Sequence, residues 1–366
     1  MSRQARRARN QLFCFLGILC FIIYLNRPQS QDKTFSWTKV QYKTTAEKLP
    51  EARGICPKLS GTKKPALVVS HVAADGDKAW LNKLAKKYHL CVYEVDAKLN
   101  QKSIYLQVPA NRGHETITYL TFLIDNYADF PEHGAVFVHG SRYAWHNDHP
   151  EYDNLALLTA LDVPAAQEPR GYYNLRCDWS TSTCLPKVAA QGSLEMRLQS
   201  VVEPWSARAA SDIALPRALA NIFGGDEASH GSNLHLGRTE TVKAQCCGQF
   251  VISRARAWQH TREEYVALRQ WLLDGTDKAA PADDRVAGRI LSYIWHIMFT
   301  EPNAADQIHL GQLNNDACPS AKDCYCRLYG RCDLECSNPG TCSGQYRVPQ
   351  DYKLPDDWEA THKHEA

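Results

Sequence analysis

The sequence lacks a clear excess of charge of either sign, since its 42 lysines and arginines nearly balance its 40 aspartates and glutamates. Proteins that bind nucleic acid through its phosphates usually carry a strong basic excess, so we expect no nucleic-acid partner. The chain also lacks an Asn-x-Ser/Thr sequon, which excludes ordinary N-glycosylation. No His-x-x-x-His pair occurs, and this absence disfavours a helical zinc site.

A long apolar run is missing as well. The run from Leu12 to Leu25 is shorter than the roughly 20 residues of a typical transmembrane helix. Four arginines before it favour a cytosolic amino terminus, and no small-x-small cleavage site follows it. We therefore expect a cytosolic basic tail at 1–11 and an uncleaved signal-anchor transmembrane segment at 12–25. The expected protein is a single-pass type II membrane protein of the Golgi or endoplasmic reticulum, with a secreted protein as the alternative.

Cysteine, by contrast, is abundant. Of the fourteen cysteines, twelve follow the amino-terminal apolar run, a usage typical of the secretory pathway rather than of a reducing cytosol. We expect all twelve to be oxidised, with Cys56 tying the preceding segment to the body and Cys177 bonded to Cys184. The adjacent Cys246 and Cys247 are expected to bond different partners.

Strand-like and helix-like patterns alternate through the first half of the chain. Apolar runs at 67–72, 91–95 and 135–138 suit buried strands, and 115–127 repeats its apolar residues at helical spacing. This alternation predicts an α/β fold with a mixed, mostly parallel sheet flanked by helices.

The second half is less regular. It contains a strand-like run at 249–253, amphipathic helical patterns at 263–273 and 285–299, and a loop-rich stretch at 167–204. Six cysteines between 318 and 342 accompany too few apolar residues for a separate core and predict a disulfide-rich C-terminal cap. The expected divisions are a stem or linker at 26–64, a lumenal α/β domain at 65–317, and a cysteine-rich cap with a polar tail at 318–366.

The stretch after the strand at 135–138 is dense in reactive side chains. Ligands of open α/β sheets bind beyond the carboxyl ends of the strands, so we expect a substrate site here. The alternative is a surface loop in which Trp145 is a buried packing anchor. The candidate catalytic residue is His146, and the candidate substrate-binding residues are His139, Gly140, Arg142, Trp145 and Asn147.

A second candidate site is the start of the helix at 115–127. Arg112, Gly113 and Glu115 lie there, and free backbone N–H groups beside Arg112 could cradle a phosphate that Gly113 allows to approach closely. Ordinary helix capping, with Glu115 favoured by the helix dipole, is the alternative.

Paired carboxylates supply the remaining candidates. Asp75 and Asp77 follow the first strand, where they could hold a divalent cation such as Mn²⁺ or Mg²⁺ that bridges a nucleotide-sugar diphosphate. An Asp-Gly-Asp sequence is also a good turn. Asp283 and Asp284, which precede the helix at 285–299, are candidate general bases, with turn and N-cap roles as the alternative.

Several strings spread over roughly residues 66 to 332 together resemble one family, the fungal family called domain of unknown function 3431. They are Val68-Val-Ser-His71, Asn111-x-Gly-x-Glu115, Thr118-Tyr-Leu120, Phe137-Val-His-Gly140, Trp145-His-Asn147, Gly171-Tyr-x-Asn-Leu-Arg-Cys177, Cys246-Cys-x-Gln-Phe-x-x-Ser-Arg254, Gly288-Arg289, Trp295-His-Ile297, Cys324-Tyr-Cys326 and Tyr329-Gly330.

The resemblance implies a type II membrane protein with an order of elements similar to the glycosyltransferase type-A fold. The chain departs from the family pattern at three places. The first strand is followed by Val72-Ala-Ala-Asp-Gly-Asp77 rather than a Tyr-Asn-Glu-Asp run, His114 replaces the usual Arg, and Ser292 replaces the usual Glu. If that acid is catalytic in the family, this chain is inactive or uses another base.

The expected function is a glycosyltransferase-like enzyme that moves a sugar from a nucleotide donor to a glycan or small-molecule hydroxyl acceptor. In this hypothesis His139 and 140–147 contact the donor phosphates or the metal, Arg112 contacts the diphosphate, and Asp283 or Asp284 is the base. The alternatives are a non-catalytic lumenal or cell-surface carbohydrate-binding protein and a metal-dependent hydrolase.

Overall fold

A mixed five-stranded sheet in the order β3-β2-β4-β6-β5 is the centre of the protein. The computed structural model describes residues 3–25, 33–99, 105–186, 188–226, 231–349, 354–355 and 357–358. The first part of the expected stem and most of the expected polar tail lie outside these residues. The strands of the sheet are β2 (Ala66–His71), β3 (His89–Glu94), β4 (Ala135–His139), β5 (Tyr172–Asn174) and β6 (Phe250–Ile252).

The pairing of the strands confirms a mixed α/β fold, but the sheet is not mostly parallel, since two of its four pairings are antiparallel. β2 pairs in parallel with both β3 and β4, whereas β6 pairs antiparallel with β4 and with β5. All six residues of β2 are buried, as are the first four of β4. A continuous apolar run is the pattern of a strand that is covered on both faces, which is why the sequence located these two strands well.

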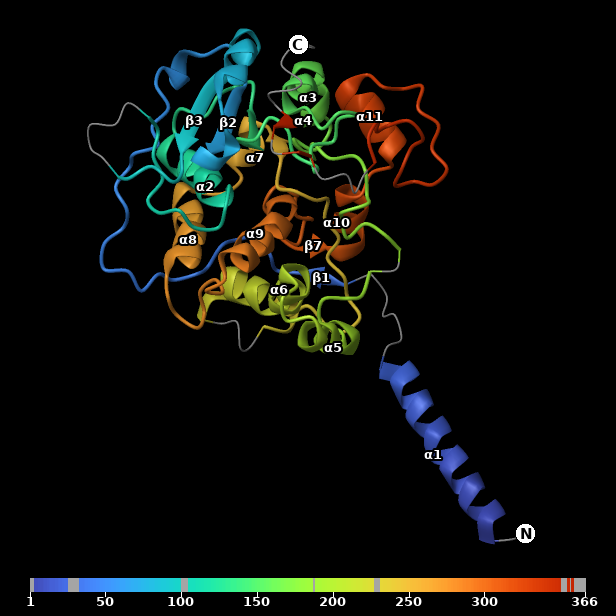
Figure 1. Ribbon diagram of the computed structural model, residues 1–366. Helices are drawn as coiled ribbons and strands as arrows, with labels where there is room; N and C mark the ends of the chain where they lie inside the picture. Colours follow the sequence, from blue (N-terminus) through green and yellow to red (C-terminus); the bar gives the residue numbers. More distant parts are fainter. Residues whose placement is uncertain are drawn as a thin grey trace.

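Helices cover both faces of the sheet, as Figure 1 shows. Successive strand residues point to opposite faces, so Val68 belongs to one apolar core, the first core, and Leu67 and Val69 belong to the other, the second core. The first core is covered by α2 (Thr116–Asp125), α6 (Ala207–Gly224), α8 (Arg262–Leu273) and α9 (Asp284–Met298). The second core is covered by η3 (Ala79–Lys86), α3 (Asn154–Ala160), α4 (Val163–Gln167) and α11 (Ala321–Tyr329).

Shorter elements complete the fold. The stretch at 167–204, expected to be rich in loops, contains β5 and α5 (Leu194–Val202). The remaining elements are α1 (Arg3–Leu25), β1 (Thr34–Phe35), η1 (Leu59–Gly61), η2 (Ala73–Asp75), η5 (Ser232–Leu234), α7 (Arg254–Ala257), β7 (Ile308–His309) and α10 (Leu310–Ala317).

The described part of the expected stem packs on the body. β1 pairs antiparallel with β7, and Phe35 and Trp37 are fully buried, with their rings stacked at 3.9 Å between centroids. Trp37 Nε1 donates a hydrogen bond to the carbonyl of Leu234 at 3.1 Å. Two large aromatic residues bury enough apolar area to hold a polar segment against the domain.

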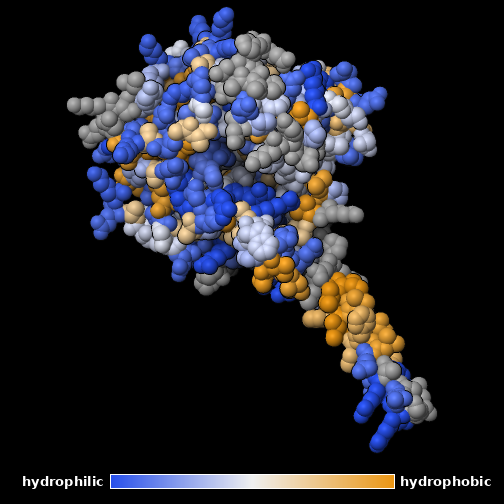
Figure 2. Space-filling view, in the orientation of Figure 1, coloured by the Kyte–Doolittle hydropathy of each residue, from blue (hydrophilic) through white to orange (hydrophobic). Residues whose placement is uncertain are grey.

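The prediction of a signal-anchor transmembrane segment is wrong. Within the described ranges, no helix is both long and apolar enough to cross a membrane. α1 has 23 residues, but its first turns contain Arg3, Arg6, Arg7 and Arg9. At about 1.5 Å per residue, the run from Leu12 to Leu25 rises only about 21 Å, against about 30 Å of hydrocarbon. Figure 2 shows the apolar residues of α1 beside its hydrophilic amino-terminal end.

All twelve cysteines that follow α1 are paired, as expected. Cys56 is bonded to Cys91, which ties the expected stem to β3, whereas Cys246 and Cys247 are bonded to each other rather than to different partners. The other disulfides are Cys177–Cys324, Cys184–Cys318, Cys326–Cys332 and Cys336–Cys342. Such complete pairing is typical of an oxidising compartment.

The prediction of a Cys177–Cys184 bond is also wrong, because both cysteines bond the C-terminal region. α11 buries Tyr325 and Leu328 in the second core, which brings Cys324 beside Cys177. The cap is therefore part of the second core and is not a separate module.

Removing a disulfide that closes a long loop should destabilise the protein more than removing one that closes a short loop. The Cys177–Cys324 bond closes 147 residues and the Cys326–Cys332 bond closes 6. Chain entropy predicts losses of about 5 and about 2 kcal/mol for the two double Cys→Ala variants. Chemical denaturation measures both, and equal losses would contradict the connectivity.

Candidate functional site

A cleft of about 390 Å³ opens at the carboxyl ends of β2 and β4. The connection from β2 to β3 runs through η3 over the second core, and the connection from β3 to β4 runs through α2 over the first core. β3 and β4 lie on either side of β2, and the connections that lead into them cover opposite faces, so the strand order reverses between β2 and β4. Open α/β sheets bind ligands at such a switch point. The start of α2, α9 and the Cys246–Cys247 turn form the other walls.

Asp75 is the first acidic group in the cleft. The Val72 N–H donates to its Oδ2 at 2.9 Å, and the Ser141 hydroxyl donates to its Oδ1. Gly140 permits this approach of η2 to the loop after β4, because a Cβ there would lie 2.6 Å from Asp75 Oδ2 and 2.8 Å from the Cα of His71. The two strand ends are thus held together by a carboxylate that keeps spare lone pairs for a ligand.

Glu115 is the second acidic group and lies half-buried at the start of α2. Burial raises its pKa, with the charges of Asp75 and Asp284 adding to the rise, while a backbone hydrogen bond and His114 oppose it. Gly248 packs closely against the carboxyl group, since a Cβ there would lie 2.9 Å from Oε1. A carboxyl group with a raised pKa is suited to proton transfer near neutral pH.

Two histidines form a hydrogen-bonded pair at the floor of the cleft. His139 Nε2 lies 2.8 Å from Asn147 Oδ1 and 2.9 Å from His146 Nε2. Asn147 donates through its Nδ2 to the carbonyls of Arg142 and Tyr152 at 2.9 and 3.0 Å, which orients its Oδ1 toward His139. Because Oδ1 only accepts, we assign the His139 proton to Nε2 and the His146 proton to Nδ1.

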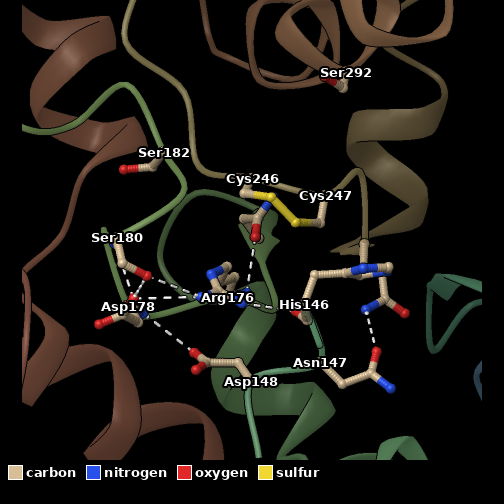
Figure 3. Close-up of a disulfide and its surroundings, with 12 residues drawn as sticks. His146, Asn147, Asp148, Arg176, Asp178, Ser180, Ser182, Cys246, Cys247 and Ser292 are labelled. Atoms are coloured by element: carbon tan, nitrogen blue, oxygen red, sulfur yellow. Dashed lines mark hydrogen bonds and ion pairs between the residues drawn. A yellow bond between two sulfur atoms is a disulfide. The ribbon is translucent and has the colours of Figure 1, made fainter. Parts of the chain in front are cut away.

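Both histidines are held neutral. Burial lowers the pKa of His139, and Asp75 and Asn147 only partly offset that effect. Burial, His139 and Arg176 together hold the pKa of His146 well below its usual value. Arg176 donates from Nη1 to the His146 carbonyl at 2.8 Å, and its guanidinium is paired with Asp178 at 3.3 Å, as Figure 3 shows.

Two arginines on α9 differ in their electrostatic environment. Arg285 pairs with Asp283 at 3.0 Å. Arg289 makes no ion pair within 4.0 Å with any described residue, and its Nε has no hydrogen-bond partner there. Its guanidinium lies 5.8 Å from the ring of Tyr293. The cleft therefore contains a positive charge that no carboxylate pairs with directly.

Trp145 lies at the rim and is 48% exposed, so it is not the buried anchor that one alternative required. Its ring is perpendicular to that of His146, with 5.2 Å between centroids. The indole face that remains exposed is a surface on which a flat apolar ligand face can stack.

Five of the side chains singled out in the sequence thus come together in the cleft: Asp75, Glu115, His139, Trp145 and His146. Others support it from outside. Asn147 is fully buried, Gly140 packs behind Asp75, and Arg142 binds Asp153 through two hydrogen bonds of 3.0 and 2.9 Å.

The expected phosphate-binding residues Arg112 and Gly113 instead bond to Asp284, one of the two expected bases. We call this contact, which joins the start of α2 to the start of α9, the α2–α9 latch. Asp284 Oδ1 accepts hydrogen bonds from Arg112 at 2.8 Å and from the Gly113 N–H at 2.5 Å. Asp283 caps α9 through the Arg285 N–H, and its hydrogen bond to the Arg285 side chain lowers its pKa. Neither aspartate lines the cleft, and an aspartate whose pKa is lowered is a poor base.

The expected metal pair is also separated. Asp77 is exposed and accepts from the Ala79 N–H at 2.9 Å at the start of η3, so only Asp75 faces the cleft. In the described ranges, the one trio of metal-type ligand atoms within 4.8 Å of one another is Cys56, His89 and Cys91, whose two cysteines form a disulfide. A cation in the cleft would therefore need oxygen atoms from its ligand as well as from Asp75.

Sequence reasoning named the groups contributed by α9 and by the turn before β6 only as parts of the family pattern and did not include them among the candidate site residues. Arg289 and Ser292 line the cleft together with the Cys246–Cys247 disulfide. The sequence did contain a signal for a polar helix face, since Arg285, Arg289 and Ser292 recur at helical spacing and lie on one side of the helix. This helix face borders the ends of β2 and β4, but the spacing of residues along the helix cannot predict that contact.

Comparison with known proteins gives one match. A family model described as "Protein of unknown function (DUF3431)" matches residues 67–327, which include the sheet, the cleft and most of α11. No curated protein and no solved structure matches the chain significantly.

The histidine pair should make stability depend on pH. The folded pKa values of His139 and His146 lie below that of an unfolded histidine, about 6.5. Their contribution is complete above about pH 6.5 and is lost as the pH falls toward the folded values, at no more than about 1.4 kcal/mol per pH unit for each histidine.

Urea denaturation between pH 7.5 and 5 measures this effect. The fall in stability should be smaller in His146→Asn than in the wild type, and Glu115, whose raised pKa acts in the opposite direction, is common to both. His133→Asn, which removes an exposed histidine, is the control and should keep the wild-type slope. An unchanged slope in His146→Asn would contradict the neutral pair.

Proposed function

The chain belongs to the DUF3431 family of proteins of unknown function, and we propose that its cleft is the active site of a glycosyltransferase-like enzyme. The reaction transfers a sugar from a nucleotide donor to a hydroxyl group of a glycan or small-molecule acceptor. The observation that carries the proposal is the charge arrangement of the cleft. Arg289 makes no ion pair within 4.0 Å with a described residue, although Asp212 interacts with it electrostatically, and Asp75 and Glu115 line the same space.

A nucleotide-sugar diphosphate fits this arrangement. The guanidinium of Arg289, whose Nε has no hydrogen-bond partner among the described residues, would bind a phosphate, with which arginine forms strong bidentate hydrogen bonds. Asp75 would hold a divalent cation together with phosphate oxygens, since Mg²⁺ and Mn²⁺ favour oxygen ligands and often take only one or two from the protein. Such a cation, when bound, would neutralise charge on the diphosphate.

Glu115 is the proposed general base in place of Asp283 and Asp284, which are committed to the α2–α9 latch and to capping. The acceptor hydroxyl gives its proton to the Glu115 carboxylate while its oxygen bonds to the anomeric carbon of the donor. The bond from that carbon to the phosphate oxygen breaks, and the nucleoside diphosphate leaves with the electron pair. The raised pKa of Glu115 increases its affinity for that proton.

The neutral histidines shape this site. His139 and His146 present no positive charge that would attract the diphosphate away from Arg289. A type-A glycosyltransferase-like arrangement of the elements, which the sequence resemblance implied, remains part of this proposal and enters by analogy alone. The six disulfides favour a secreted protein or the lumen of the Golgi or endoplasmic reticulum as its location.

A non-catalytic carbohydrate-binding protein is the second candidate, and the exposed rim position of Trp145 favours it. An indole that is 48% exposed beside a polar cleft can stack on the apolar face of a sugar ring. This candidate requires sugar binding without turnover, and the two proposals therefore differ in the effect expected of Glu115 substitutions.

Removing the charge of Arg289 should weaken donor binding. Calorimetry with UDP-sugars and GDP-mannose, with and without Mn²⁺, should show at least about tenfold weaker binding by Arg289→Ala, because a charge-assisted hydrogen bond contributes about 1.5–3 kcal/mol. Asp75→Asn should abolish the Mn²⁺ dependence. Arg217→Ala removes a guanidinium outside the cleft and should bind as the wild type does. Equal donor affinity of Arg289→Ala and Arg217→Ala would contradict the proposal that Arg289 binds the donor.

Glu115→Gln should separate chemistry from binding. Loss of a general base typically lowers kcat by about 10²–10⁴-fold, while donor affinity should stay within about threefold. Asp283→Asn is the matched control, because asparagine caps a helix as well as aspartate, and it should keep full turnover. If Asp283→Asn loses turnover and Glu115→Gln keeps it, the general base is Asp283, as the sequence suggested, and not Glu115.

A further inference from the structure

A separate cavity of about 130 Å³, the inner cavity, adjoins the cleft. Its walls come from β5, the chain before the Cys246–Cys247 turn, the last turns of α9, and α10. Ser292 lines both spaces. Figure 3 shows Ser292 across from the disulfide, with Arg176 on the other side of it.

Three buried polar groups line the inner cavity and have no hydrogen-bond partner among the residues that the structure describes. They are His296 Nε2, Gln245 Oε1 and Arg176 Nε, on side chains that are only 5%, 6% and 4% exposed. Gln245 donates through its Nε2 to the Cys177 carbonyl at 3.4 Å, which leaves Oε1 as the unsatisfied acceptor. An unpaired buried polar group costs folding free energy, so three around one cavity indicate groups that are reserved for a ligand.

The charged groups at the rim are, in contrast, already paired. Arg170 binds Asp316 at 2.6 Å, and Arg256 binds Glu301 at 2.7 Å. Inside, the guanidinium of Arg176 is balanced by Asp178, and burial lowers the pKa of His296 to about 3, which keeps it neutral. No charge is left for an ionic ligand, and what remains is one acceptor, one donor and a neutral imidazole. Hydroxyl groups satisfy all three, because each can donate and accept.

The remaining walls suit a single ring. Tyr172 and Phe299 lie 5.7 Å apart with an interplanar angle of 31°, and both line the cavity, as does Leu313. The cavity is similar in volume to the engineered one of about 150 Å³ that holds benzene, so it has room for a six-membered ring, and some substituents of a hexose must extend toward the rim or the cleft. Aromatic walls with a few fixed polar groups are typical of pre-formed small-molecule sites.

We propose that the inner cavity binds one uncharged, hydroxylated ring, that is, a single pyranose unit. Its hydroxyls reach Gln245, Arg176 and His296, and its ring packs against Tyr172 and Phe299. Because Ser292 borders both spaces, a hydroxyl on that side of the ring faces the cleft. The identification of this sugar as the acceptor rests on the proposed function, whereas the binding itself does not.

The test uses the whole chain without any donor. Glucose, galactose, mannose and phenol are the probes, and saturation-transfer NMR with titration measures their binding. A hexose should bind the wild type and bind at least about tenfold more weakly to Gln245→Met and His296→Phe. These variants should keep or raise the thermal midpoint, since each removes an unsatisfied buried group.

Gln191→Met is the matched control. Gln191 is a fully buried glutamine whose amide is satisfied by the Val242 carbonyl at 2.8 Å and the Val242 N–H at 3.1 Å. This variant should lose stability and keep hexose binding. Ala317→Leu fills the cavity from the α10 side and should abolish hexose binding. It tests the same site if the Gln245 or His296 variants fail to fold.

Two kinds of result overturn the proposal. One is a cavity that holds water only or binds phenol but no hexose. The other is hexose binding that all three cavity variants leave unchanged. Gln245→Met should bind UDP-sugars as the wild type does. Loss of donor binding in Arg289→Ala and loss of hexose binding at the inner cavity are therefore measured separately.

Discussion

The parallel pairing of β2 with β4 is the constraint on which the rest of the structure depends. Both strands are buried on both faces, so helices must cover the sheet on each side, and the strand order reverses between them because β3 and β4 lie on either side of β2. Their adjacent carboxyl ends bring Asp75 and the His139 pair to one place. Gly140 lets the two loops approach until the Ser141 hydroxyl reaches Asp75.

Charges around the cleft divide into those that hold its walls and those that remain available. The Arg112–Asp284 and Arg142–Asp153 pairs fix α9 against α2 and the loop after β4 against α3. Arg289, Glu115 and the neutral histidines are positioned by these pairs without joining them. Ion pairs that are already formed make the walls rigid. Groups that lack an ion-pair partner or have a raised pKa are the ones suited to bind a ligand or transfer a proton.

Disulfides extend the same frame to the carboxyl end of the chain. Cys177–Cys324 and Cys184–Cys318 hold α11 and the end of α10 against the segment that follows β5. That segment supplies Arg176, which contacts both His146 and the inner cavity. The C-terminal region therefore supports the site, although it contributes little to the lining of the cleft.

The sequence by itself determined four of the five strands of the sheet, the helices α2, α8 and α9, and the loop that becomes the floor of the cleft, because burial on both faces and helical spacing can be recognised from local residue order. It did not determine β5, which lies in a stretch expected as loops. It did not determine that Asp283 and Asp284 are committed to the α2–α9 latch and to capping, that Arg289 forms no ion pair with a described residue, or which cysteines bond each other. These depend on contacts between residues as far apart as Arg112 and Asp284 or Cys177 and Cys324. The apolar run of α1 misled for a related reason, since composition suggested a span that its length does not support. Only the tertiary structure decides pairing, because a charge or a thiol finds its partner in space rather than along the chain.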